Sequence, residues 1–265
     1  MTMQAPLRPP SPNILDISGV GLTYRTTSGR TEALRGISLS VSQGEFVSVV
    51  GPSGCGKSSL LKLVLGLERA TRGSLAIGGT EISGPSRGVG AVFQAPVLLP
   101  WRTIEENVLL PIDVMRLDRK SASERAHGLL RMVGLGDFGQ RYPYELSGGM
   151  QHRAAIVRAL VHDPRLLIMD EPFAALDAIT REQMASELQR IFMESGKTIV
   201  FITHSISEAV FLSDRIVVMS ARPGRIMAVF ENRTPRPRAF SALATPELAK
   251  LSDQIRSSLD LASAA

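Results

Sequence analysis

The sequence lacks several features that would place it in a particular class of protein. It has a single cysteine, Cys55, so no internal disulfide can form, which is typical of a chain kept in a reducing compartment. Aromatic residues make up 5% of the chain, with one tryptophan. No apolar run approaches the ~18–20 residues that span a bilayer. Residues 1–13 are proline-rich without the apolar core of a signal peptide, so we expect a flexible lead-in.

Charge does not identify a partner either. The chain has 30 Lys and Arg against 25 Asp and Glu, a formal net charge of +5, but the basic residues are scattered. Such scatter is weak evidence for nucleic acid and is equally compatible with a nearby anionic membrane surface. We therefore expect no nucleic-acid partner. With 265 residues, of which 44% are hydrophobic, the chain can bury a full core.

A glycine-rich loop between a predicted strand (45–50) and a predicted helix (59–66) is the most informative stretch. Glycines let successive backbone N–H groups point at phosphate oxygens, and the helix N-terminus adds partial positive charge. Lys57 would reach the β- and γ-phosphates, and the Ser58 hydroxyl would ligate Mg²⁺. A chance turn is disfavoured by the flanking elements, so the pattern predicts a nucleoside triphosphate site. Its predicted binding residues are Gly51, Pro52, Ser53, Gly54, Cys55, Gly56, Lys57, Ser58 and Ser59.

An acidic pair follows a second buried strand, predicted over 166–169. Asp170 suits the second-sphere Mg²⁺ role in a phosphate-loop enzyme, and Glu171 suits orienting or deprotonating the attacking water. Alone, such a pair would indicate only the start of a helix. The phosphate loop in the same chain favours the catalytic interpretation.

The remaining pattern alternates strands and helices. Strands are predicted over 14–20, 36–41, 73–77, 89–93, 197–202 and 215–219, and helices over 178–194 and 206–212. This alternation predicts an α/β fold with a mostly parallel sheet. Strand signals disappear between about 95 and 162, which predicts an inserted all-helical subdomain. Residues 231–265 form a tail whose helix has an apolar face, expected to dock on its own domain rather than on a partner. That face comprises Leu248, Leu251, Ile255 and Leu259.

Four further features fall in a characteristic order. A second anion-binding helix N-terminus lies at 146–151, Gln94 follows a strand, His204 follows another, and Tyr24 precedes the phosphate loop. Together, residues 14–230 resemble the ATP-binding subunit of ABC transporters. The resemblance implies ATP and Mg²⁺ as ligands and a phosphate-loop NTPase core with an antiparallel β subdomain.

The resemblance also implies residue roles. Tyr24 would stack on adenine, Gln94 would touch Mg²⁺ or the attacking water, and His204 would contact the γ-phosphate. In a dimer of two copies, the 146–151 segment and the loop before Asp177 would complete the partner's site. Ala175 stands where a serine is usual, which puts one hydrogen bond across the sites in doubt. The residues implied for the shared site are Ser147, Gly148, Gly149, Gln151 and Asp177.

The subfamily follows from two stretches. Residues 95–103 and 220–226 resemble importers of nitrate, sulfonates, taurine and related small anions. This implies permease subunits, a solute-binding protein acting indirectly, and a place on the cytoplasmic face of a bacterial membrane. Leu98, Leu99 and Trp101 either dock on the permease or pack in the helical core. The alternatives are an ABC exporter or lipid-transport ATPase, or a soluble ABC ATPase acting on nucleic acid or ribosomes.

Overall fold

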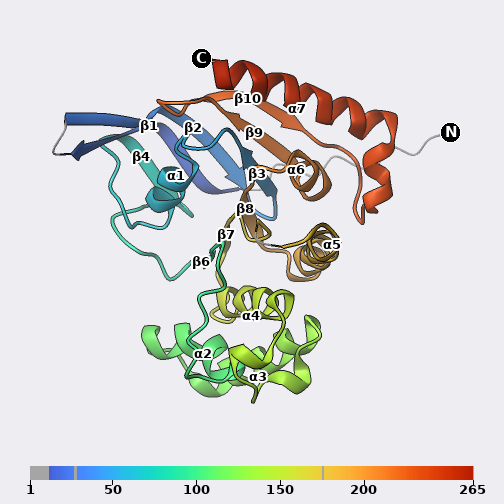
Figure 1. The fold of residues 1–265 in the computed structure, drawn as a ribbon. Coiled ribbons are helices and arrows are strands. Elements are labelled where there is room, and N and C mark those ends of the chain that lie inside the picture. Colours follow the sequence, from blue (N-terminus) through green and yellow to red (C-terminus); the bar gives the residue numbers. More distant parts are fainter. Residues whose placement is uncertain (1–11, 27–28, 175, 265) are drawn as a thin grey trace.

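The computed structural model describes residues 12–26, 29–174 and 176–264, and it contains two sheets (Figure 1). The larger sheet has the strand order β10-β9-β3-β8-β7-β6, parallel except for the antiparallel edge strand β10. Every residue of β3 and β8 is buried, as their unbroken apolar and β-branched runs predict. The strands are β3 (Phe46–Val50), β6 (Val89–Val92), β7 (Leu166–Asp170), β8 (Thr198–Ile202), β9 (Arg215–Met219) and β10 (Ile226–Glu231).

The smaller sheet is antiparallel, with the order β2-β1-β4-β5. Its strands β1 (Asn13–Thr26) and β2 (Gly29–Ser42) extend well beyond the predicted 14–20 and 36–41, so Tyr24 pairs with Thr31. In β2, buried and exposed residues alternate only over 37–41, whereas none of residues 29–33 is buried; the polar half is a strand because it pairs with β1. Thr26, Gly29 and Arg30 therefore belong to the two strands, and residues 27–28 lie outside the described residues. The shorter strands are β4 (Arg72–Ile77) and β5 (Thr80–Glu81).

Three helices form a separate unit below the sheets in Figure 1. Thr103 begins this unit with a capping box, because its hydroxyl accepts from the Glu106 N–H and the Glu106 carboxylate accepts from the Thr103 N–H. Short 3₁₀ turns at Gly136–Phe138 and Pro143–Glu145 join the last two helices. The unit consists of α2 (Ile104–Met115), α3 (Arg119–Met132) and α4 (Gly148–Leu160).

Helices α1 (Lys57–Val64), α5 (Ala178–Ser195) and α6 (Ile206–Leu212) accompany the large sheet. The last helix, α7 (Pro246–Ala264), follows a 3₁₀ turn at Phe240–Ala244 and lies along β9, β10 and α6. Leu248 and Ile255 are buried there, so the apolar face docks on its own domain, as predicted. Within the described residues, no helix is both long and apolar enough to span a bilayer.

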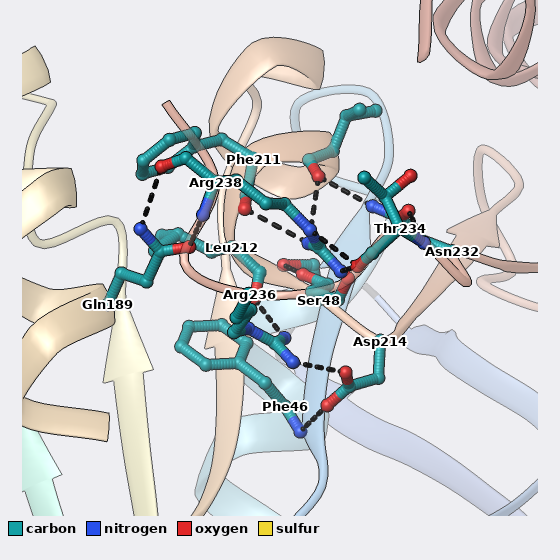
Figure 2. A network of polar contacts seen from close by, with 12 residues as sticks. Phe46, Ser48, Gln189, Phe211, Leu212, Asp214, Asn232, Thr234, Arg236 and Arg238 are labelled. Carbon is teal, nitrogen blue, oxygen red and sulfur yellow. Dashed lines mark hydrogen bonds and ion pairs between the residues drawn. The ribbon is translucent and has the colours of Figure 1, made fainter. Parts of the chain in front are cut away.

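Two arginines anchor the segment between β10 and α7 (Figure 2). Arg238 donates to the carbonyls of Val210, Phe211 and Ser213 at the end of α6, and its backbone N–H donates to Gln189 of α5. Burial lowers the pKa of Arg238 to about 10. Arg236 pairs with Asp214, and its guanidinium lies 4.8 Å from the centroid of the Phe192 ring. Arg238 is therefore buried and Arg236 half-buried against the domain, although Pro235 and Pro237 between them are exposed.

Candidate functional site

Four loops open at one edge of the large sheet. The register pairs Val49 of β3 with Ile202 of β8, Ile202 with Asp170 of β7, and Met169 of β7 with Val92 of β6. Because these strands are parallel, their carboxyl ends align, and open α/β sheets bind ligands at that edge. The edge carries the phosphate loop, Asp170 with Glu171, and the segments that lead to Gln94 and His204.

The phosphate loop requires its glycines. At Gly56 the φ angle is 97°, and a Cβ there would lie 2.7 Å from Leu34 Cδ2. At Gly51 a Cβ would lie 2.7 Å from the Cys55 sulfur. The loop is curled around the buried Lys57, whose Nζ donates to the Gly51 carbonyl at 2.8 Å and the Pro52 carbonyl at 3.1 Å. The Lys57 ammonium and the N-terminus of α1 thus lie at the same curved stretch of backbone, an arrangement that binds polyphosphates.

The loop that joins β9 to β10, residues 220–225, contacts the phosphate loop. Arg222 Nε donates to the Gly54 carbonyl at 3.2 Å. A Cβ on Gly224 would lie only 2.0 Å from the Cys55 carbonyl oxygen, so glycine is required for this close approach. In the sequence, residues 220–226 indicate only a subfamily. Their contact with the phosphate loop joins positions 168 residues apart, so no local pattern indicates it.

The two carboxylates occupy different environments. The pKa of Asp170 is raised mainly by burial and also by the neighbouring Glu171, while Lys57 opposes the shift. Glu171 has a φ of 45°, rare for a residue with a side chain, and its Oε2 lies 3.1 Å from His204 Nδ1. The structure therefore brings Glu171 and His204 together and places the Lys57 charge near Asp170.

The predicted magnesium ligands fit that ion by chemistry. The Ser58 hydroxyl, the Gln94 amide and the Asp170 carboxylate all supply oxygen, which Mg²⁺ prefers. Burial and the neighbouring Glu171 raise the pKa of Asp170, and a cation bound there would oppose that shift. Tyr24 lies beside α1, with its hydroxyl 3.3 Å from Ser59 Oγ, and is half-buried.

The residues expected to act across a dimer lie on exposed helix ends. Ser147 caps α4, its Oγ accepting from the Met150 N–H at 3.3 Å, and Asp177 caps α5 by accepting from the Thr180 N–H at 3.0 Å. Ser147, Gly148 and Asp177 are exposed, and Gly149 is half-buried. The side-chain amide of Gln151 instead donates hydrogen bonds to the carbonyls of Pro143 and Leu146. Ala175 lies outside the described residues.

Figure 1 places α4 in the helical unit, apart from α1 and the phosphate loop. The structure thus brings Lys57, Asp170, Glu171 and His204 to one sheet edge and leaves Ser147 on another unit. Trp101 is 71% exposed in the loop before α2, while Leu98 and Leu99 are half-buried. Of the two alternatives for Trp101, packing inside the helical core does not hold, because only Leu98 of these three residues joins that core.

Comparison with known proteins is consistent across sequence and structure. Residues 34–174 match a family model described as ABC transporter. An aliphatic sulfonates import ATP-binding protein of Bacillus cereus is 41% identical over 89% of this chain and 93% of its own length. A taurine import ATP-binding protein of Rhizobium johnstonii is 41% identical over 95% and 100%.

Among solved structures, a dimeric ATP-binding cassette in a post-hydrolysis state with ADP and Pi has a TM-score of 0.71 at 32% identity. That match covers 83% of this chain and all of the other. An ABC transporter component from Clostridium perfringens has a TM-score of 0.75 at 25% identity, covering 94% and 98% of the two chains.

Proposed function

The chain belongs to the ABC transporter family, and from that premise we propose that it is the ATP-hydrolysing subunit of an importer for small anions. The observation that carries the proposal is the meeting of the phosphate loop, the acidic pair and His204 at one sheet edge. The α/β fold with a parallel core, an antiparallel sheet and inserted helices agrees with the cassette structures that the chain resembles.

In the proposed mechanism, the backbone N–H groups of residues 51–58 and the Lys57 ammonium bind the phosphates, and Tyr24 stacks on adenine. When bound, Mg²⁺ would supply positive charge that stabilises the negative charge developing on the phosphates. Ser58, Gln94 and Asp170 would hold that ion. Glu171 accepts a proton from the attacking water, and this role fits a carboxylate that keeps an ionisable partner, His204, at 3.1 Å.

We further propose that two copies form the working unit. The exposed α4 N-terminus presents Ser147, Gly148 and Gly149, an anion-binding arrangement without an acidic residue in its first turn. When Lys57 holds the γ-phosphate, one side of that phosphate stays uncovered, and α4 of the partner copy would cover it. The dimeric cassette with ADP and Pi supports this arrangement.

The relatives named for sulfonates and taurine support an anionic substrate of that kind. We propose membrane permease subunits as partners, docked at the exposed Trp101, with a solute-binding protein delivering the solute. The subunit would then work on the cytoplasmic face of a bacterial inner membrane, without nucleic acid.

The proposal is tested with the purified chain. It should release phosphate from ATP with Mg²⁺ and stop when the ion is chelated. Co-expressed with the permease encoded beside it, it should co-purify with membranes, and ATP turnover should rise when a sulfonate-loaded binding protein is added. A chain that binds ATP but never hydrolyses it, alone or with its permease, would contradict the proposed role.

A further inference from the structure

Helix α4 holds the loop that begins at Gln94. The His152 ring lies between two carbonyl oxygens, with Nε2 3.2 Å from the Gln94 oxygen and Nδ1 2.9 Å from the Gly148 oxygen in the first turn of α4. Its side chain is buried, with 4% of the residue exposed. A neutral imidazole has one N–H and donates to one of these carbonyls at a time, but in either tautomer the ring fills the space between them.

A second side chain of α4 grips the same loop. Arg158 donates from Nη2 to the Pro96 carbonyl and from Nη1 to the Val97 carbonyl, both at 2.6 Å. Burial lowers the pKa of Arg158. Val97 has a φ of 46°, which is unfavourable for a β-branched residue and persists only where the surroundings impose it. The planar fork of Arg158 is such a constraint, since it fixes two consecutive carbonyls.

These contacts connect two parts of the proposed site. Ser147, His152 and Arg158 belong to one continuous helix with its cap, and the loop they hold starts at Gln94. An α-helix moves as a rigid body because each turn is hydrogen-bonded to the next. A displacement of the Gln94 backbone that these contacts transmit to α4 would therefore reach the helix end at Ser147.

We propose that His152 and Arg158, which we call the α4 clamp, couple the Gln94 loop to the Ser147 end of α4. This inference rests on the proposed function, because it links the residue expected to sense magnesium and water in one site to the residue expected to close the other. His152 and Arg158 are positioning residues. They act through the backbone of residues 94–97 and do not touch nucleotide.

The chain provides a matched control for the clamp. Arg153, also on α4, donates to the Val133 carbonyl at 2.8 Å, a bond of the same kind made entirely inside the helical unit. Arg158→Met and His152→Leu remove the clamp, whereas Arg158→Lys and His152→Gln retain a donor. Arg153→Met removes a comparable bond without touching the loop.

Two readouts separate coupling from folding. In the wild-type loop, the Leu99 amide donates to Asn107 Oδ1 and the Arg102 amide donates to the Leu99 carbonyl. In nucleotide-free protein, hydrogen exchange at these two amides should accelerate in Arg158→Met and His152→Leu but not in Arg153→Met. With MgATP, Arg158→Met should bind a fluorescent ATP analogue within about twofold of wild type while kcat falls about tenfold, the scale of one lost charged hydrogen bond. Arg158→Lys should recover part of kcat.

Equal exchange rates in Arg158→Met and Arg153→Met would overturn the clamp, and so would equal kcat values. If Arg158→Met does not fold, His152→Leu, which also removes a clamp contact, carries the same comparison with Arg153→Met. If the wild-type chain hydrolyses no ATP, the proposed function fails, and the exchange rates alone then decide whether the clamp holds the loop.

Discussion

Replacing Glu171 with glutamine removes the proposed general base and little else. Glutamine has the same length and keeps an oxygen that can accept from His204 Nδ1, now 3.1 Å from the carboxylate. The backbone bond from the Glu171 N–H to the Ile202 carbonyl, 2.9 Å long, does not involve the side chain. The repulsion that raises the pKa of Asp170 decreases as well, so the fold should not be weakened.

The expected loss is therefore that of proton transfer alone. General-base catalysis contributes about 10²–10⁴-fold, or roughly 2.7–5.5 kcal/mol of barrier. Glu171→Gln should bind ATP and accumulate as a dimer in gel filtration with MgATP, while phosphate release falls by that factor. Glu182→Gln, an exposed change on α5, is the matched control and should leave turnover unchanged. Turnover of Glu171→Gln close to wild type would refute the role assigned to Glu171.

Three other changes test separate parts of the account. Asp170→Asn should abolish hydrolysis but raise the melting temperature of the nucleotide-free chain near neutral pH. The pKa of Asp170 is raised in the folded chain, so its ionised carboxylate lowers the stability of the fold at neutral pH, and asparagine removes that cost. In thermal melts, the increase in melting temperature should shrink as the pH falls toward 3.8, the ordinary pKa of the carboxyl group. Trp101→Ala should leave ATP turnover intact but weaken binding to the permease about tenfold or more, measured by co-purification and titration, since tryptophans are frequent interface anchors. Arg238→Met should lower the unfolding free energy in urea by about 2–5 kcal/mol, because carbonyls of Phe211 and Ser213 lose their donor, whereas the exposed Arg233→Met should change it by less than about 1 kcal/mol.

The features that the sequence predicted well depend on local patterns. The phosphate loop and the Asp170–Glu171 pair follow buried apolar strands, and parallel strands align their carboxyl ends whatever the rest of the chain does. The family resemblance drawn from these motifs is confirmed by the relatives and by the cassette structures. The roles of individual site residues remain proposals that the experiments above address.

The features that the sequence did not predict depend on contacts between distant positions. The polar half of β2 has a loop-like sequence, and its pairing with β1 is what makes it a strand. Strand β10 lies at the edge of its sheet, and half of its residues are exposed. Arg238 joins a helix 25–28 residues earlier in the chain, and Arg158 reaches carbonyls 61 and 62 residues away. A buried arginine has no local sequence signal that separates it from a solvated one, so these networks become visible only in the fold.

The central claim is that each hydrolytic site is built from two copies of the chain, and mixed dimers test it most directly. Ser147→Arg should block closure and Lys57→Ala should weaken nucleotide binding, so each homodimer should be nearly inactive. In a mixed dimer both lesions fall on the same composite site, which leaves the other site intact. ATP hydrolysis should therefore reappear when the two inactive variants are mixed. Activity that stays at the homodimer level, with mixed dimers shown to form, would contradict the shared site.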